Sequence, residues 1–459
     1  MSRATGGGPG RDRGDGGGGG DGARDDRGDS GGGRGARDGG SGPAPRLRAA
    51  ILTREFPPEV YGGAGVHVAE LASALSPLVD VEVHCFGPPR DSPLVAGSYE
   101  PWSALGTSSP ESAALAALSV DLAMAAGLGG RGGDGSGGRG PPAVCHSHTW
   151  YTNLAGHLAG LLWGIPHVAT THSLEPLRPW KVEQLGGGYA LSSWCERTGL
   201  EGADAVVAVS AAMRDDILAC YHDIDPDRVD VVHNGIDARR WRPDPGTGAL
   251  ERLGLDPDDA LVVFVGRVTR QKGLVHLLGA ARLLDRRTHL VCCAGAADTP
   301  ELAAEVRGLV EEVRAAGVRL TWVEGQLPQP EVAQLLTHAR VLVCPSVYEP
   351  FGLVNLEAMA CGTAVVASAV GGIPEVVVDG ETGLLVEVEM EEGAAAAPLH
   401  PRRFAADLAE RMGELVDDPA RARRLGEAGR RRAVESFGWP AVAERTAALY
   451  RRLAAAGAG

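Results

Sequence analysis

Glu349 and Glu357 lie eight residues apart, separated by Pro350-Phe351-Gly352 and followed by an alanine- and leucine-rich run. If a helix begins near Gly352, the first free N–H groups, at Gly352 and Leu353, carry the positive end of its dipole and favour an anion. Glu357 would then lie inside the helix, roughly 7.5 Å further along its axis. Carboxylates accept hydrogen bonds from hydroxyl groups but repel phosphate. The spacing is therefore typical of a site that binds an anionic group between two hydroxyl-bearing ones.

The alternative is that Glu349 is only a helix N-terminal charge and Glu357 a surface residue. The neighbours of Glu357 disfavour a fully solvated side chain because most of them are apolar: Leu353, Val354, Leu356 and Met359.

A basic turn, Gly266 to Gly273 with the sequence GRVTRQKG, follows the apolar run Leu261 to Val265. The chain has 44 lysines and arginines, and all but Lys181 and Lys272 are arginine. A lysine at position 272 therefore suggests a site that needs a compact ammonium group at a phosphate. If the phosphate belongs to a diphosphate, Arg267 could bind the same group. The alternative is an ordinary solvated basic turn.

Glycines and histidines in the first half follow predicted strands. Gly62 and Gly63 come between a strand and a helix, where glycine lets the backbone approach a phosphate or sugar closely. A tight turn explains them equally well, since the GxGxxG spacing is missing. His146, His148 and His172 lie at the carboxyl ends of two predicted strands, where parallel folds keep their chemistry. Because His146 alternates with His148, only one should face a cleft. We expect no histidine or cysteine ligand set and no bound metal.

Alternating apolar and amphipathic runs must position these residues. Strands are expected at Arg48–Leu52, Val81–Phe86, Ala143–Ser147, His167–Thr171 and Ala205–Val209, with helices near 65–77, 111–126, 152–163, 188–200 and 211–220. A second cycle gives strands at Leu261–Val265, His289–Cys293, Val318–Trp322, Val341–Cys344 and Ala364–Ala367, followed by helical runs from Arg402 to Ser436 and Pro440 to Leu453. The repeated βαβ pattern predicts an α/β fold with two Rossmann-like, doubly wound domains facing each other across a cleft.

The domain boundaries follow from composition. Residues 1–46 form a Gly/Arg/Asp-rich tail that we expect to be disordered, and 127–142 a glycine-rich flexible insertion. The N-terminal domain should span 47–240 and the C-terminal domain 241–436. Residues 437–459 should form a helix that packs back on the N-terminal domain.

Bulk properties exclude several protein classes. A net charge of -15 disfavours a nucleic-acid-binding protein, which usually needs a basic surface. The eight cysteines show no CxxC spacing, and we expect them to be reduced residues of the core. No segment is long and apolar enough to cross a membrane. We expect a cytoplasmic protein.

The order of these motifs, from YGGAG through the histidines and GRVTRQKG to the two glutamates, resembles retaining glycosyltransferases of family 4 with the GT-B fold. The stretches Leu52–His67 and Thr171–Tyr189 are similar to the actinobacterial glycogen synthase family, also described as α-maltose-1-phosphate synthase. Larger glycogen and starch synthases carry a KxGG pattern, and here the lysine position is Val60. This departure favours the shorter family.

The resemblance implies that the domain at 47–240 binds the acceptor and the domain at 241–436 the nucleotide-sugar donor. It also implies a role for each matching residue. Arg267 and Lys272 would bind the donor diphosphate, Glu357 the ribose and Glu349 the transferred glucose. His172 would orient the donor sugar near its anomeric carbon. The other donor-binding residues would be Gly62, Gly63, Phe351, Gly352 and Leu353. On the acceptor side the expected residues are His148, Arg178 and Lys181, although the last two could equally be ordinary loop cations.

The implied activity is transfer of glucose from ADP-glucose to glucose 1-phosphate, to an α-1,4-glucan end, or to both, without a cofactor. A homodimer is possible. Alternatives are a related enzyme with another nucleotide-sugar donor, a non-catalytic sugar-nucleotide sensor, a same-fold epimerase and, weakest, a dehydrogenase. The donor base, the acceptor, the oligomeric state and the role of the tail stay open.

Overall fold

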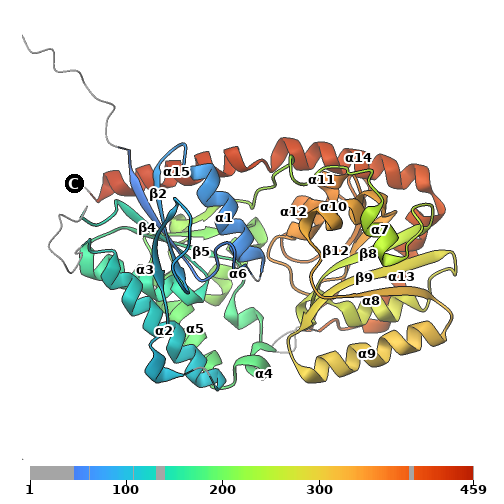
Figure 1. Ribbon diagram of the computed structural model, residues 1–459, viewed down its shortest axis with the longest axis horizontal. Helices are drawn as coiled ribbons and strands as arrows, with labels where there is room; N and C mark the ends of the chain where they lie inside the picture. The colour runs from blue at the N-terminus through green and yellow to red at the C-terminus, as the bar shows by residue number, and fades with distance from the viewer. Residues whose placement is uncertain (1–45, 61, 107, 131–139, 392–396, 458–459) are drawn as a thin grey trace, which may run out of the picture. The chain divides into compact units, whose positions relative to one another are not determined.

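Two parallel β-sheets organise the chain in the computed structural model, which describes residues 46–60, 62–106, 108–130, 140–391 and 397–457 (Figure 1). The predicted N-terminal tail lies outside these residues except for Arg46, as does most of the predicted insertion at 127–142. Residues 46–459 make up one unit by their contacts, so the predicted boundaries at 46/47, 240/241 and 436/437 stay predictions.

The first sheet has seven strands in the order β3-β2-β1-β4-β5-β6-β7, all paired in parallel. Its strands are β1 (Arg48–Thr53), β2 (Asp80–Phe86), β3 (Val95–Tyr99), β4 (Val144–His148), β5 (His167–Thr171), β6 (Ala205–Ala208) and β7 (Val229–Val231). Successive residues of β1 pack on opposite faces, as the period of two requires. Ala49 and Ile51 join one buried cluster, and Ala50 and Leu52 join another.

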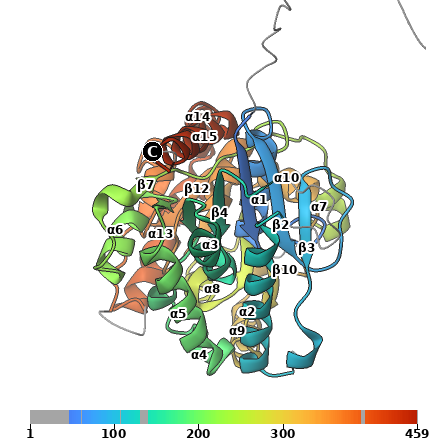
Figure 2. The same cartoon turned by 90° about the vertical axis from the view of Figure 1, so that its left-hand side faces the viewer.

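Helices cover both faces of this sheet. The helices are α1 (Gly63–Leu75), α2 (Pro110–Gly127), α3 (Trp150–Trp163), α4 (Lys181–Leu185), α5 (Gly188–Glu201) and α6 (Ala211–Cys220). Helices α2, α3 and α5 contact one another on one face, and Figure 2 shows their ribbons close together. On the other face α1 contacts α15 (Trp439–Ala456), the last helix of the chain.

Helix α15 is therefore part of the first sheet's core, although it follows the second sheet in sequence. Val442, Ala443 and Tyr450 share a buried cluster with Ile51 of β1. The ring nitrogen Nδ1 of His146, on β4, lies 2.6 Å from the Tyr450 hydroxyl.

The second sheet has six parallel strands in the order β10-β9-β8-β11-β12-β13. They are β8 (Ala260–Val268), β9 (Thr288–Ala297), β10 (Arg319–Glu324), β11 (Val341–Cys344), β12 (Ala364–Ser368) and β13 (Leu384–Val386). The helices of this half are α7 (Gly248–Leu253), α8 (Leu274–Ala281), α9 (Pro300–Ala315), α10 (Gln329–His338), α11 (Leu353–Cys361), α12 (Ile373–Val376), α13 (Pro401–Asp417) and α14 (Pro419–Ser436).

The strand orders confirm the predicted doubly wound fold. In each sheet the second and third strands are added on one side of the first strand, and the later strands are added on its other side. The direction of strand addition therefore reverses between β1 and β4 and between β8 and β11. Ligands of such sheets bind outside the carboxyl ends of the strands at this reversal. The candidate residues lie at or after the carboxyl ends of β1, β4, β5, β8 and β11.

Three local predictions were incomplete. Strand β3 was missed because it is a short edge strand with Gly97 in its centre, and β13 because it has only three residues. The helical run from Arg402 to Ser436 is two helices, because the residue before a proline avoids the helical conformation. Asp418 precedes Pro419, has φ −116°, and accepts a hydrogen bond from the Arg421 N–H as the cap of α14.

Hydrogen bonds join residues of the two sheets near the candidate site. The Ser210 hydroxyl, at the start of α6, donates to the carbonyl of Pro350 at 2.7 Å. The Leu174 N–H donates to the Tyr348 hydroxyl at 3.3 Å. These bonds flank Glu349, so the segment that carries it is held against the first half of the chain. None of the described helices combines the length and apolar character that crossing a membrane requires.

Candidate active site

Lys272 and Glu349 form an ion pair at the carboxyl ends of β8 and β11. The ammonium nitrogen Nζ lies 2.6 Å from Glu349 Oε2, and the Ser346 hydroxyl donates to the same oxygen at 3.1 Å. The Glu349 side chain is 8% exposed and that of Lys272 25%. Burial acts to lower the pKa of Lys272, whereas the negative charge of Glu349 and its hydrogen bond act to raise it. The raising contributions together outweigh burial, so the pKa is raised and the ammonium stays charged.

The backbone around this pair is fixed by a turn that precedes Lys272. The Thr269 hydroxyl caps the short helical turn Arg270–Lys272 by accepting a hydrogen bond from the Lys272 N–H at 3.2 Å. Gly273, with φ +62°, then packs so closely that a Cβ would lie 1.9 Å from the carbonyl oxygen of Pro345. The turn and the segment after β11 are thus in direct contact, which sets the position of Lys272 relative to Glu349.

Two glycines that follow β12 hold Glu349 from the other side. The Gly372 N–H donates to the Glu349 carbonyl at 3.0 Å. Gly371 has φ +51°, and a Cβ there would lie 2.1 Å from the same carbonyl oxygen. A side chain at position 371 would therefore push the backbone of Glu349 away.

We expect Gly371→Ala to lower kcat by up to about 10²-fold, because a displacement of roughly 1 Å in a positioning residue can cost that much. The matched control is Gly380→Ala. Gly380 has φ +74°, so it meets the same left-handed strain, but a Cβ there would contact nothing within 4 Å. Steady-state kinetics and thermal melts of both variants provide the test. Equal losses of kcat would show that backbone strain, and not the contact with Glu349, is responsible.

Helix α11 begins directly behind Glu349. Gly352, with φ +98°, caps it, and the Asn355 N–H bonds to the Gly352 carbonyl at 3.0 Å. The N–H groups of Gly352, Leu353 and Val354 precede the first intrahelical bond, so they offer donors and the positive end of the helix dipole. Phe351 is buried and contacts the rings of His233 and Phe437, so it supports this turn from behind.

Glu357 lies one turn into α11 and is half-buried. Burial raises the pKa of its carboxyl group from 4.5 to about 8, and the attraction of Lys272 offsets only part of this shift. In the folded protein the carboxyl therefore holds its proton at pH values where the unfolded chain has lost it. The free energy of unfolding should fall as the pH rises from about 4.5 to about 8.

The Glu357→Gln variant should be more stable than the parent protein at pH 8.5, by about 1–3 kcal/mol, and equally stable at pH 4.5. The neutral amide carries no proton to lose, so it removes this pH dependence. Urea unfolding at both pH values measures the difference. Glu435→Gln, at an exposed position of α14, is the control and should change stability little at either pH. A constant difference between the Glu357 variant and the parent protein would contradict the assigned pKa shift.

The other predicted donor-binding cation, Arg267, lies near the end of β8. Its guanidinium group donates to Asp298 Oδ1 at 3.0 Å, and the side chain is 36% exposed. Lys181 lies at the start of α4, and its pKa is lowered to about 8. Burial is the main cause, repulsion from Arg178 is the second, and repulsion from Arg267 also contributes. Arg267 is thus near enough to both lysines, Lys181 and Lys272, to repel their ammonium groups.

Arg178 has internal partners. Its guanidinium group pairs with Glu175, whose side chain is fully buried. Glu175 also accepts from the Ser192 hydroxyl, and its own N–H donates to the buried Glu196. Burial, followed by repulsion from Glu175, raises the pKa of Glu196 to about 8. The charge of Arg178 is thus offset inside the protein.

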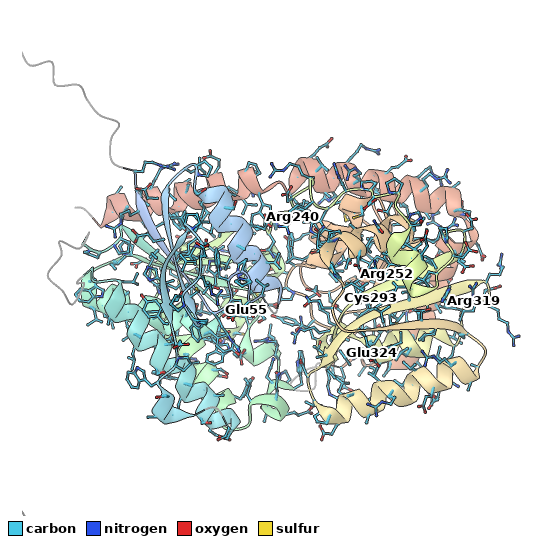
Figure 3. All side chains as sticks on the ribbon, in the orientation of Figure 1. Glu55, Arg240, Arg252, Cys293, Arg319 and Glu324 are labelled. Atoms are coloured by element: carbon cyan, nitrogen blue, oxygen red, sulfur yellow. The ribbon has the colours of Figure 1, made fainter. Side chains whose placement is uncertain are left out.

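The predicted glycine pair lies at the start of α1. The Gly62 N–H donates to Glu55 Oε2 at 2.8 Å, so a carboxylate already occupies that donor (Glu55 is labelled in Figure 3). Gly63 faces α11, since a Cβ there would lie 3.3 Å from the Leu353 side chain. Gly63 therefore allows α1 and α11 to pack closely, while the expected approach of a phosphate or sugar to the glycine pair stays a prediction.

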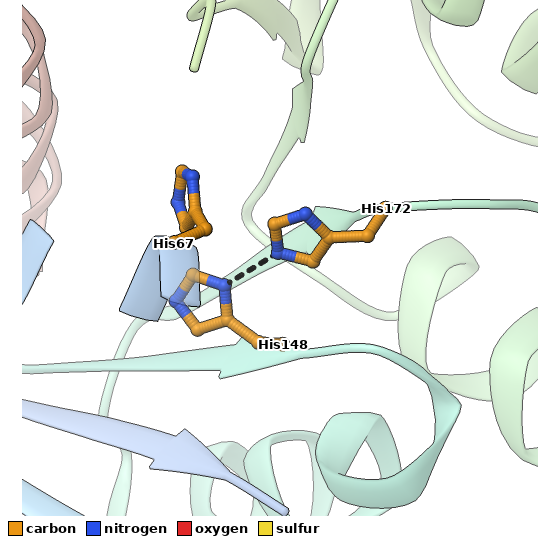
Figure 4. A group of neighbouring side chains, drawn as sticks. All are labelled: His67, His148 and His172. Carbon is orange, nitrogen blue, oxygen red and sulfur yellow. Dashed lines mark hydrogen bonds between the residues drawn. The ribbon is translucent and has the colours of Figure 1, made fainter. Parts of the chain in front are cut away.

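Three histidines gather between α1 and the ends of β4 and β5 (Figure 4). His148 Nδ1 lies 3.1 Å from His172 Nε2, and the ring of His67 is 4.7 Å from that of His172 between centroids. Burial lowers the pKa of all three, that of His67 to about 4, so the imidazoles are neutral at pH 7. Only His148 of the predicted pair takes part, since His146 bonds to Thr170 and Tyr450.

Sequence reasoning expected no histidine ligand set, whereas the structure brings one potential ligand atom from each of His67, His148 and His172 within 4.8 Å of the others. The expectation of no bound metal stays a prediction. Sequence reasoning missed His67, which lies one helical turn after Gly63 and so on the same face of α1. Its position on the buried face of α1, shared with Val68 and Leu71, was the available signal. Ser346, Asp298 and Gly371 were also missed.

Family models match both halves of the chain. Residues 61–240 match the description "Glycosyltransferase Family 4" and residues 249–432 "Glycosyl transferases group 1". The chain is 53% identical over 412 residues to a protein named alpha-maltose-1-phosphate synthase from Mycolicibacterium smegmatis, covering 89% of this chain and 100% of the relative. It is 31% identical over 428 residues to a protein named glycogen synthase from Mycobacterium tuberculosis, covering 88% and 94%. Among solved structures, sucrose-phosphate synthase from Thermosynechococcus elongatus matches with a TM-score of 0.69 and 27% identity, covering 90% of this chain and 100% of the other.

Proposed function

We propose the function of this chain from its family. It belongs to the group 1 and family 4 glycosyltransferases, so its reaction class is glycosyl transfer. Within that class we propose that it transfers glucose from ADP-glucose to glucose 1-phosphate, forming maltose 1-phosphate. The observation that carries the proposal is the 53% identity to an alpha-maltose-1-phosphate synthase over that relative's whole length. An α-1,4-glucan end is the second candidate acceptor, favoured by the 31% identity to a glycogen synthase.

The donor diphosphate would bind where Arg267, Lys272 and the first amides of α11 meet. A lysine ammonium has three N–H donors, so Lys272 can bond to Glu349 and still donate to a phosphate oxygen. The guanidinium group of Arg267 matches the geometry of phosphate oxygens. The α11 dipole adds a further favourable contribution for an anion.

The transferred glucose would lie against Glu349. The bonds from Lys272 and Ser346 both end at Oε2, so Oε1 can accept from a sugar hydroxyl, by resemblance the 3-hydroxyl. Glu357 would bond to the ribose at the other end of the diphosphate, while Phe351 would act only by supporting the turn. His172 would orient the sugar near its anomeric carbon, and Gly62 and Gly63 would allow the donor to pass close to α1.

In the proposed reaction the acceptor hydroxyl attacks the anomeric carbon from the face that the diphosphate leaves, which retains the configuration. A bond forms between the acceptor oxygen and that carbon as the carbon–oxygen bond to the diphosphate breaks. The leaving diphosphate keeps the electron pair and takes the acceptor's proton, so ADP departs. Lys272, Arg267 and the α11 amides stabilise the charge that develops on the diphosphate, which is commonly the largest share of catalysis.

The acceptor phosphate would bind near Lys181 and His148. Lys181 is charged at pH 7, since its pKa is about 8, and Arg267 is among the charged groups near enough to influence that pKa. A nearby phosphate dianion would raise this pKa and keep the ammonium charged. The pairing of Arg178 with buried Glu175 supports a positioning role for that arginine in the same loop.

The test is product analysis. Purified protein is incubated with ADP-glucose and either glucose 1-phosphate or glycogen, and products are identified by ³¹P NMR and mass spectrometry. We expect maltose 1-phosphate and stoichiometric ADP. Parallel reactions with UDP-glucose test the donor base, and omission of acceptor tests for hydrolysis or epimerisation. Transfer to glycogen alone would replace the first acceptor with the second. Absence of ADP release with either acceptor would overturn the enzymatic assignment for this donor.

A further inference from the structure

We propose that His67, His148 and His172 form a binding site for a single Zn²⁺ ion or a cation of similar chemistry such as Co²⁺. The three side chains come from three separate elements, α1, the end of β4 and the loop after β5, and they meet at one place (Figure 4). The group found among the described residues contains histidines alone. Neutral nitrogen ligands suit zinc, whereas magnesium and calcium prefer oxygen ligands.

The distances fit a three-histidine site after a small movement. Two nitrogens bound to one tetrahedral zinc, each at about 2.0–2.1 Å, lie roughly 3.4 Å apart. His148 Nδ1 and His172 Nε2 are already 3.1 Å apart, and the third ligand atom, from His67, lies within 4.8 Å of both. A rotation of the His67 ring that shortens its separations by about 1.4 Å would complete the triangle.

The hydrogen-bond count independently points to a missing partner. Three neutral imidazoles carry three N–H donors and three acceptor lone pairs. The bond between His148 and His172 uses one of each. Nδ1 of His67 and Nε2 of His148 are buried and have no hydrogen-bond partner. An unsatisfied buried polar group costs about 1–3 kcal/mol, and a cation bound by Nδ1 of His67 would remove that cost at this atom. Binding through Nδ1 of His148 and Nε2 of His172 would replace the hydrogen bond between these rings, and Nε2 of His148 would then carry the N–H.

Three protein ligands leave a fourth position on a tetrahedral ion, which is the arrangement of zinc sites that bind an exchangeable ligand. His172 is only partly buried, so that position would open on the side of the proposed donor sugar. Zinc and donor would therefore compete for His172. This consequence, unlike the site itself, rests on the proposed function.

Metal binding is tested directly on the full-length protein. We expect one equivalent of Zn²⁺ to bind in calorimetry, and Co²⁺ to give the visible absorption of a tetrahedral site without a thiolate charge-transfer band. His67→Gln and His148→Gln should each weaken binding at least tenfold, since loss of an outer-sphere partner alone costs about 10–100-fold. His222→Gln, at an exposed position, is the matched control and should leave affinity unchanged.

Two further measurements keep the test decisive. Thermal melts identify any variant that fails to fold, and anomalous diffraction from zinc-soaked crystals of the parent protein locates the ion without a variant. Density between the three rings supports the site. Anomalous density only at a cysteine or elsewhere on the protein overturns the site. An unchanged zinc affinity in a folded His67→Gln variant also overturns it. In transfer assays zinc should raise the apparent KM for the donor and EDTA should reverse the effect; a bound ion that leaves this KM unchanged would overturn the competition.

Discussion

Replacing Lys272 with alanine is expected to lower kcat with ADP-glucose by about 10²–10³-fold, the usual effect of removing one preorganised donor from a developing negative charge. The residue is one of two lysines in the chain and contacts Glu349 across 77 positions of sequence. Its ammonium would stabilise the leaving diphosphate. Initial rates at saturating donor measure the loss.

Removing Lys272 also leaves Glu349 buried without its cation, so a simple loss of stability could imitate a loss of catalysis. The double variant Lys272→Met with Glu349→Gln separates the two effects, because it removes both charges together. We expect it to recover most of the thermal stability lost in Lys272→Ala and none of the activity. Arg282→Ala, an exposed cation at the end of α8, is the matched control and should retain normal kcat. Near-normal turnover by Lys272→Ala would contradict the assigned role.

Replacing Arg178 with alanine should lower the free energy of unfolding by about 3–5 kcal/mol, the typical cost of leaving a buried charge without its partner. The side chains of Arg178 and Glu175 are 15% and 0% exposed, and Glu196 is buried beside them. Two acidic groups would then face each other without a cation. Denaturant unfolding of the purified variant measures the change.

Arg197→Ala provides the control for this prediction. Arg197 lies on α5 next to Glu196, but its side chain is 62% exposed and its pair with Glu201 spans 3.8 Å, so its loss should cost little. Kinetics distinguish the two roles considered for Arg178. A structural role predicts lower stability with a small change in the KM for glucose 1-phosphate. Unchanged stability with a large rise in that KM would return Arg178 to the acceptor site.

The fold could be predicted from sequence because its strands are short apolar runs with clear limits. The predictions for β5 and β11 match the structure at both ends, and the eight other strands expected above were also placed within a few residues. The two doubly wound sheets follow from the alternation of strands and helices, and the strand orders confirm them. The resemblance to family 4 glycosyltransferases is confirmed by both family models.

The candidate site was predictable where one residue type was unusual for its surroundings. Lys272 stood out because the chain otherwise uses arginine, and Glu349 and Glu357 because of their spacing around Gly352. Their roles stay predictions. The structure adds that Lys272 and Glu349 are partners, which no local pattern could show.

Contacts between distant segments explain the rest. The burial of Arg178 depends on Glu175 and on Glu196, which comes from α5. His67 joins His148 and His172 only after the first sheet and α1 have packed together. Periodicity reports which face of an element is buried, but it does not report which residues meet there. Partners of this kind have to be read from a three-dimensional structure.

The central claim is that Arg267, Lys272 and the first amides of α11 bind a nucleotide diphosphate. A crystal structure of the protein with ADP-glucose tests it most directly. The account predicts diphosphate oxygens within hydrogen-bond distance of Lys272 Nζ and of the N–H groups at Gly352 to Val354, with the glucose against Glu349. A nucleotide bound elsewhere, with these groups left in contact with solvent, would contradict it.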